Sequence, residues 1–315
     1  MSRLPAETYL SHLRSESARF REVLAGCDPD ARVPSCPDWD AADLLWHLAT
    51  VQRWWAEVVG ARPAQPDEVD PPRPGTYDEL LATYDEWSRQ LADVLDGADP
   101  AEEAWNWSDD HTVGFILRRQ AHEALVHRVD AELAAGVSSE VDARLASDGV
   151  HECLDVMYGA MPAWGTWEPG EGLVRVDVTD TGEEFWLRFG VFSGTSPESG
   201  TTYDGEEDFH VVEAPGGDVE PDVVVDGPAA ALDLWLWSRG DDSAVSVAGD
   251  EATYARFRAV IEAPINGSDN QRSLRDVSLT TAALSEGHHD HHQDHRPRGR
   301  PRPRPRTGGR PCGHR

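Results

Sequence analysis

Three side chains of the kinds that bind metal ions occupy helical positions in this chain. His47 lies within one amphipathic segment, and Glu123 and His127 are four residues apart in another. Residues four apart in a helix share a face, so the second pair can act together. Two histidines and a carboxylate facing a helical core would form a three-ligand site with an open position, the usual form of catalytic zinc. The spacing therefore predicts a metal-dependent enzyme.

The hydrophobic pattern indicates that these side chains face inward. Between positions 43 and 58, one stripe at about 100° per residue is apolar except for His47. Its members are Leu44, His47, Leu48, Val51, Trp55 and Val58. Between positions 114 and 136, the stripe that holds the second pair contains Ile116, Gln120, Glu123, Ala124, His127, Ala131 and Ala134. His122 lies about 100° from Glu123 around the helix, so we do not expect it to be a ligand.

Two other interpretations of the three residues stay open at this level. His47 could be a core histidine with its hydrogen bonds satisfied, and Glu123 with His127 could be an ordinary pair on a helix face. A carboxylate buried without a partner is unfavourable, and it would otherwise take up a proton. A bound divalent cation would explain why Glu123 lies beside a histidine on an inward face.

Five helical segments are expected in the first half of the chain. Leu10, Leu13, Phe20 and Leu24 mark the first, and the His47 segment is the second, with Asp40 as its N-cap. A proline-rich link at 63–74 leads to a third helix at 77–95. The fourth carries Glu123 and His127, and the fifth covers about 143–160.

After Trp167 the pattern changes to the alternation of β-strands. We expect strands at 173–178 and 185–189 joined by a turn at 180–182, a loop at 190–208, and a strand at 223–225. A helix from 228 to 237, a strand at 245–247 and a helix at about 250–261 follow. The predicted fold class is α+β, with a metal-binding helical bundle at 1–165, a small α+β domain at 166–265 and a disordered low-complexity tail at 266–315.

The charge of the chain argues against partners that are themselves anionic. The formal net charge is −30, and every basic residue is arginine. Residues 287–315 contain eight arginines and two aspartates, so the rest of the chain carries −36. Such a body would repel nucleic acid and anionic membranes, so neither is an expected partner. A compositional bias without functional content explains the charge equally well.

Cysteine usage and the first residues indicate the compartment. The four cysteines, Cys27, Cys36, Cys153 and Cys312, have neither the spacing of a disulfide framework nor a CxxC pair, which fits a reducing cytoplasm. The first residues lack the basic start and apolar run of a signal peptide, and no stretch of 18 apolar residues occurs. A cytoplasmic protein without a membrane span is expected.

Two motifs make the chain resemble the mycothiol-dependent maleylpyruvate isomerase family. The first is Val33-Pro34-Ser35-Cys36-Pro37-Asp38-Trp39 followed by Asp43-Leu44-Leu45-Trp46-His47-Leu48 and Arg53-Trp54-Trp55. The second is Ala121-His122-Glu123-Ala124-Leu125-Val126-His127-Arg128-Val129-Asp130-Ala131-Glu132. Looser similarity extends the match to roughly residues 8–262. The resemblance implies a DinB-like four-helix bundle at the N-terminus.

The resemblance also implies a function. In this family His47, Glu123 and His127 would bind a divalent metal, usually zinc, with water or the sulfur of a low-molecular-weight thiol in the open position. Zinc would keep mycothiol as a thiolate, which adds to the cis double bond of maleylpyruvate before rotation and elimination. Arg239 is the candidate for holding a substrate carboxylate, because its planar fork pairs with such a group. The chain departs from the family pattern at Ser238 and Asp38, where glycine is common.

Three hypotheses about function follow. The first is a metal- and mycothiol-dependent enzyme, either the isomerase or a thiol S-transferase that acts on small electrophiles. The second is a non-catalytic metal-containing binding protein, which a fourth protein ligand would favour. The third is an interaction or regulatory protein that uses the arginine-rich tail.

Overall fold

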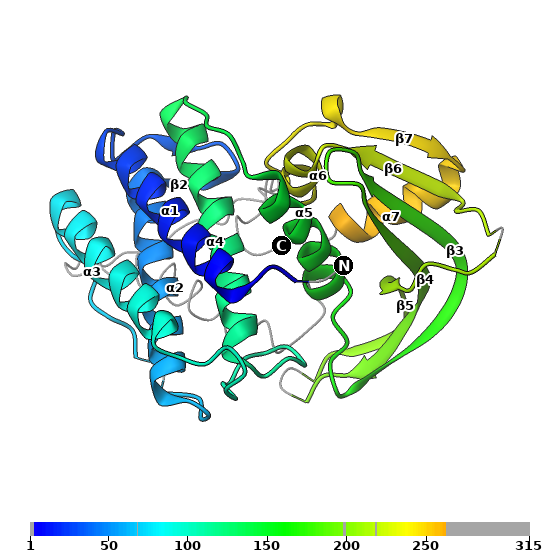
Figure 1. Cartoon of the computed structure of the whole chain (residues 1–315), viewed down its shortest axis with the longest axis horizontal. Coiled ribbons are helices and arrows are strands. Elements are labelled where there is room, and N and C mark those ends of the chain that lie inside the picture. Colours follow the sequence, from blue (N-terminus) through cyan, green and yellow to red (C-terminus); the bar gives the residue numbers. More distant parts are fainter. Residues whose placement is uncertain (1–2, 68, 198–199, 218, 263–315) are drawn as a thin grey trace, which may run out of the picture.

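Four helices packed side by side form the first layer of the computed structural model, which describes residues 3–67, 69–197, 200–217 and 219–262 (Figure 1). They are α1 (Ala6–Ala25), α2 (Ala41–Ala61), α3 (Tyr77–Asp96) and α4 (Val113–Ala135). Helix α1 packs on α4, and α2 packs on α3. The helical bundle predicted from the sequence is therefore confirmed, and the predicted tail lies outside the described residues.

The two helices that carry the candidate ligands begin at side-chain caps. A short ladder of β1 (Arg32–Val33) and β2 (Cys36–Asp40) leads into α2, where Asp40 accepts a hydrogen bond from the Asp43 amide at 2.8 Å. This confirms Asp40 as the N-cap. At the start of α4, the Thr112 hydroxyl accepts from the Phe115 amide at 3.1 Å. Such caps satisfy amides that have no partner within the helix, so both helix starts are well defined.

The predicted fifth helix is divided into two parts. Helix α5 (Ala143–Glu152) continues directly into η1 (Cys153–Tyr158), a π-helical segment. In Figure 1 these two elements lie between the bundle and the second half of the structure. Helix α5 packs on α6 (Ala229–Leu236), and η1 packs on β5 (Thr202–Val212).

A five-stranded mixed sheet forms the second half. Its order is β5, β4 (Glu183–Thr195), β3 (Gly165–Val178), β6 (Val223–Gly227) and β7 (Ser246–Gly249). Strands β3 and β6 are parallel, and the other neighbours are antiparallel. Helix α6, the one-turn 3-10 helix η2 (Asp242–Ala244) and α7 (Glu251–Glu262) complete this half, and α7 packs against β3, β5 and β6. The α+β fold class is confirmed.

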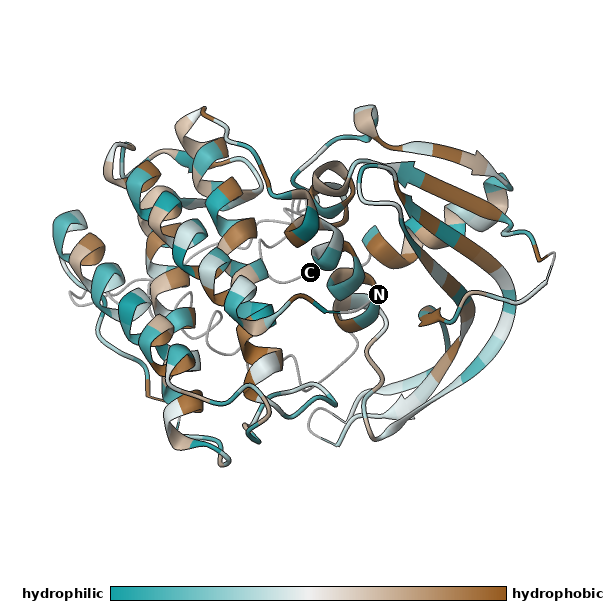
Figure 2. Ribbon diagram, viewed as in Figure 1, coloured by the Kyte–Doolittle hydropathy of each residue, from teal (hydrophilic) through white to brown (hydrophobic). Residues whose placement is uncertain are grey.

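The loop predicted at 190–208 was wrong. Strand β4 continues to Thr195 and pairs with β5, with Phe192 opposite Glu206 and Gly194 opposite Tyr203. Most residues of β5 are exposed or only partly buried, so the alternation that identifies a half-buried strand is absent. Figure 2 shows that the outer parts of these strands are largely pale or teal, whereas hydrophobic residues gather toward the inner parts of the sheet. Strand β5 forms this edge of the sheet through backbone hydrogen bonds to β4. A search for periodic side-chain patterns does not detect such backbone pairing.

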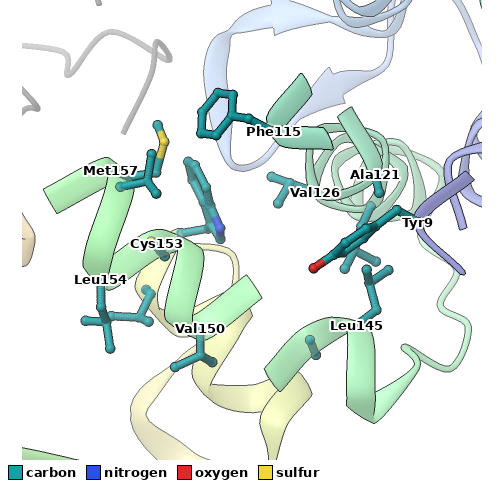
Figure 3. Close-up of a cluster of buried hydrophobic side chains, with 14 of the residues drawn as sticks. Tyr9, Phe115, Ala121, Val126, Leu145, Val150, Cys153, Leu154 and Met157 are labelled. Carbon is teal, nitrogen blue, oxygen red and sulfur yellow. The ribbon is translucent and has the colours of Figure 1, made fainter. Parts of the chain in front are cut away.

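One hydrophobic core runs from the bundle into the sheet domain through α5 and η1. Figure 3 shows this junction, where side chains from α1, α4, α5 and η1 meet: Tyr9, Phe115, Ala121, Val126, Leu145, Val150, Cys153, Leu154 and Met157. A second cluster fills the other end of the bundle around Phe20, Leu44 and Tyr84. Among the described helices, none combines the length and apolarity that crossing a membrane would require.

Candidate metal centre

The structure brings His47, Glu123 and His127 together at the inner faces of α2 and α4. One possible ligand atom from each residue lies within 4.8 Å of the others. Glu123 Oε1 is 3.1 Å from His127 Nε2 and 3.8 Å from His47 Nε2. Both histidines are buried, and the Glu123 side chain is 17% exposed. The inward orientation expected from the hydrophobic stripes is thus what the fold produces.

The two separations from Glu123 Oε1 are compatible with a shared divalent ion. Ligand atoms about 2.0–2.1 Å from a tetrahedral zinc ion lie about 3.3 Å from one another. The two separations from Glu123 Oε1, 3.1 and 3.8 Å, bracket that value. A carboxylate and two imidazoles are also a donor set that suits zinc. The residues therefore fit the metal that the sequence resemblance implies, with three protein ligands.

Aromatic packing limits the freedom of the two histidine rings. The ring of Trp39, on β2, lies 4.7 Å from the ring of His47 between centroids. The His47 and His127 rings meet edge to face at 4.8 Å and 75°. The strand that leads into α2 therefore also supplies an aromatic ring that packs against His47.

Asp130 contacts the ring nitrogen of His127 that does not face Glu123, and so fixes the orientation of the ring. Its Oδ2 is 2.9 Å from His127 Nδ1, which leaves Nε2 directed at Glu123. A carboxylate behind a ligating histidine fixes the ring tautomer and increases the basicity of the other nitrogen. Asp130 is fully buried and also accepts a hydrogen bond from the Ser35 hydroxyl. Sequence reasoning missed this residue, although its position one helical turn after His127 was a usable signal.

Burial and the charges within the cluster move the pKa values of the three residues in different directions. Burial by itself raises the pKa of Glu123, but the hydrogen bond from His127, the nearby His47 imidazole and the charge of Arg119 hold it well below its usual value. Burial lowers the pKa of His47. Burial also acts to lower the pKa of His127, but Asp130 and Glu123 outweigh it and raise that pKa to about 9. Glu123 is therefore ionised at neutral pH, as a metal ligand must be.

Arg239 lies beside the metal centre but is held by Asp130. Its Nε and Nη2 each donate to one oxygen of Asp130 at 2.9 Å, and Nη1 donates to the Trp237 carbonyl at 2.7 Å. Burial acts to lower the pKa of Arg239, but the charge and hydrogen bonds of Asp130, with a smaller contribution from the charge of Glu123, raise it. Ser238 has φ of 60°, a left-handed conformation that glycine adopts more easily than serine, which agrees with the glycine that the family resemblance implies at this position.

His122 lies apart from the three candidate ligands. Its Nε2 is 2.8 Å from Asp148 Oδ2, and the same oxygen accepts from Arg118 and from the Tyr9 hydroxyl. These contacts place His122 in a buried polar cluster between α1, α4 and α5. This position agrees with the expectation that His122 lies on a different face of the helix from Glu123 and is not a metal ligand.

Comparison with known proteins gives the family. The description "Mycothiol maleylpyruvate isomerase N-terminal domain" matches residues 10–132, and the "MDMPI C-terminal domain" matches residues 144–256. No curated protein sequence matches significantly. The crystal structure of the mycothiol-dependent maleylpyruvate isomerase has a TM-score of 0.51 at 17% identity, and that of a histidine-to-alanine mutant of it has 0.50 at 15%.

In both comparisons the match covers 78% of this chain and 93% of the other, and at these identities it supports the fold. The two matched domains together extend over both halves of the described structure, in the order and at the places where the bundle and the sheet domain lie. This chain belongs to the mycothiol-dependent maleylpyruvate isomerase family.

Proposed function

We propose that this protein is a metal- and thiol-dependent enzyme that uses a low-molecular-weight thiol, mycothiol, to act on a small electrophile. The reaction is cis–trans isomerisation of maleylpyruvate or a related compound, or transfer of the thiol sulfur to an electrophile. The convergence of His47, Glu123 and His127, backed by Asp130, is the observation that carries the proposal. Family membership supports the choice of thiol and substrate class.

Each residue of the site has a defined task in this proposal. His47, Glu123 and His127 would hold a divalent ion, most simply zinc, and a bound ion would lower the pKa of a thiol so that it is present as thiolate. Asp130 keeps His127 Nδ1 engaged and Nε2 available. In isomerisation the thiolate adds to the cis double bond, the resulting single bond rotates, and elimination of the same thiolate leaves the trans product.

Arg239 is proposed to bind a substrate carboxylate. Its three hydrogen bonds to Asp130 and the Trp237 carbonyl leave two of the five guanidinium N–H groups for a ligand. Asp130 would hold the guanidinium plane in a constant orientation, so the remaining donors would meet the carboxylate with little loss of entropy.

A metal analysis tests the ligand set. Wild type, His47→Ala and His122→Ala are compared as full-length proteins, so that the histidines near the C-terminus contribute equally to all three. We expect His47→Ala to contain about one divalent ion fewer than wild type, and His122→Ala to retain it. Equal metal content in wild type and His47→Ala would refute the ligand set.

An activity assay tests the role of the thiol. Turnover of maleylpyruvate should require added mycothiol, and the metal-free protein should be folded but inactive. Arg239→Ala should raise KM for a dicarboxylate without loss of metal, whereas loss of metal would make Arg239 structural. Turnover that is equally fast without any thiol would refute the thiol-dependent mechanism. A non-catalytic binding protein would be favoured by a fourth protein ligand, and within the described residues the group that converges has three.

A further inference from the structure

We propose that Arg119 is a positioning residue that restricts Glu123 to one metal-facing oxygen and so keeps a coordination position open for the thiol. This inference rests on the proposed function, because it concerns the same metal centre. Arg119 touches neither the thiol nor the substrate in this proposal. It acts through the carboxylate that it holds.

The two oxygens of Glu123 have different partners. Oε1 faces the histidines, at 3.1 Å from His127 Nε2 and 3.8 Å from His47 Nε2. Oε2 accepts a hydrogen bond from Arg119 Nη2 at 3.0 Å. Arg119 lies four residues before Glu123 on α4, so both side chains leave the same face of one helix. The carboxylate is thereby divided between the metal centre and the guanidinium.

Arg119 is itself fixed on its other sides. It is 3% exposed, and its Nη1 is hydrogen-bonded to Glu152, the last residue of α5. The guanidinium also lies over the Trp237 ring at 5.3 Å from the centroid. Two carboxylates therefore compensate one buried arginine, and moving the guanidinium away from Glu123 would leave buried charge unpaired. The second half of the protein, through Glu152 and Trp237, thus supports a ligand in the bundle.

The number of Glu123 oxygens bound decides how strongly a thiol can bind the ion. A zinc ion commonly has four ligands, and catalytic sites take three from the protein. Two imidazole nitrogens and one carboxylate oxygen make three, which leaves a position for sulfur. Two imidazole nitrogens and both carboxylate oxygens would make four, so water or sulfur could bind only as a weaker fifth ligand. The hydrogen bond from Arg119 to Oε2 favours the first arrangement.

The visible absorption of cobalt(II) tests this, because four-coordinate cobalt absorbs much more strongly than five-coordinate cobalt. Each full-length protein is titrated with cobalt(II), and the spectrum of His47→Ala is subtracted to remove binding elsewhere. We expect wild type to give the intense four-coordinate spectrum, with water as fourth ligand. In the double variant Arg119→Met/Glu152→Gln, whose second change avoids leaving Glu152 charged and unpaired, the freed oxygen should join the ion and weaken the absorption.

Two further variants serve as a control and as a second test of Arg119. Glu152→Gln alone keeps the Arg119–Glu123 hydrogen bond and should retain the wild-type spectrum. Arg119→Lys keeps the buried charge, so it should fold even where the double variant does not, but it lacks the planar fork that reaches both carboxylates. We expect the same direction of spectral change in Arg119→Lys, and zinc affinity about 10- to 100-fold below wild type in both Arg119 variants.

The outcomes separate this inference from the proposed function. A wild-type protein that binds no cobalt at the His47 site would refute the proposed function and this inference together. Wild-type binding combined with a wild-type spectrum in any folded Arg119 variant would refute this inference alone. A changed spectrum in the Arg119 variants and an unchanged one in Glu152→Gln would support it.

Discussion

Asp233 on α6 is predicted to make the stability of this protein depend on pH. The side chain is 1% exposed, and neither carboxylate oxygen has a hydrogen-bond partner among the described residues. The charged and titratable groups that face it are His122 and Arg119 on α4 and Asp148 and Glu152 on α5. Burial is the main reason that its pKa rises from 3.8 to about 7, with Glu152 and Asp148 acting in the same direction.

The sign and size of the effect follow from this pKa. The folded state binds the proton more tightly than the unfolded state, so the contribution of Asp233 to the free energy of unfolding is complete below about pH 4. It is lost progressively as the pH rises to about 7. A pKa difference of this size corresponds to about 4 kcal/mol. Asp233→Asn has the same shape without a titrating proton, so it should lack this dependence.

Urea unfolding followed by tryptophan fluorescence between pH 4 and pH 8 measures the effect. We expect the free energy of unfolding of wild type, relative to Asp233→Asn, to fall by up to about 4 kcal/mol across this range. Asp208, whose pKa burial also raises to about 7, is present in both proteins and cancels. Asp93→Asn, which changes an exposed carboxylate on α3, is the control and should give a flat difference. A flat difference for Asp233→Asn as well would refute the reasoning.

Three further predictions concern single residues. Asp130→Asn should weaken zinc binding about 10- to 100-fold, because the group behind His127 loses its charge, and a competition titration with a chelator measures this. Gly149→Ala should lower the free energy of unfolding by about 1–3 kcal/mol, since its Cβ would lie 2.8 Å from both Asp233 oxygens; unchanged thermal unfolding would contradict this. Ser238→Gly should raise the stability by up to about 1 kcal/mol by relieving the left-handed conformation, and a lower melting temperature would count against it.

The positions of the candidate ligand side chains on their helices could be predicted from the sequence because they depend on local periodicity. The apolar stripe around His47 and the four-residue spacing of Glu123 and His127 define inward faces without any knowledge of the neighbouring helices. The N-cap at Asp40 is local in the same sense. Strands whose side chains are buried could also be predicted from local sequence. The apolar run that contains Val223 and Val225 identified β6.

Contacts between distant parts of the chain were decided only by the tertiary structure. Arg239 meets Asp130 across 109 residues, and Trp237 meets Arg119 from the same segment, so the second half of the protein supports both candidate ligands on α4. No spacing rule encodes such contacts, because they depend on where the segment that follows α6 lies relative to α4. Strand β5 escaped detection for a related reason: its backbone pairs with β4, while its exposed side chains carry no alternating pattern. Local periodicity determines which face of an element is buried, and packing determines what that face meets.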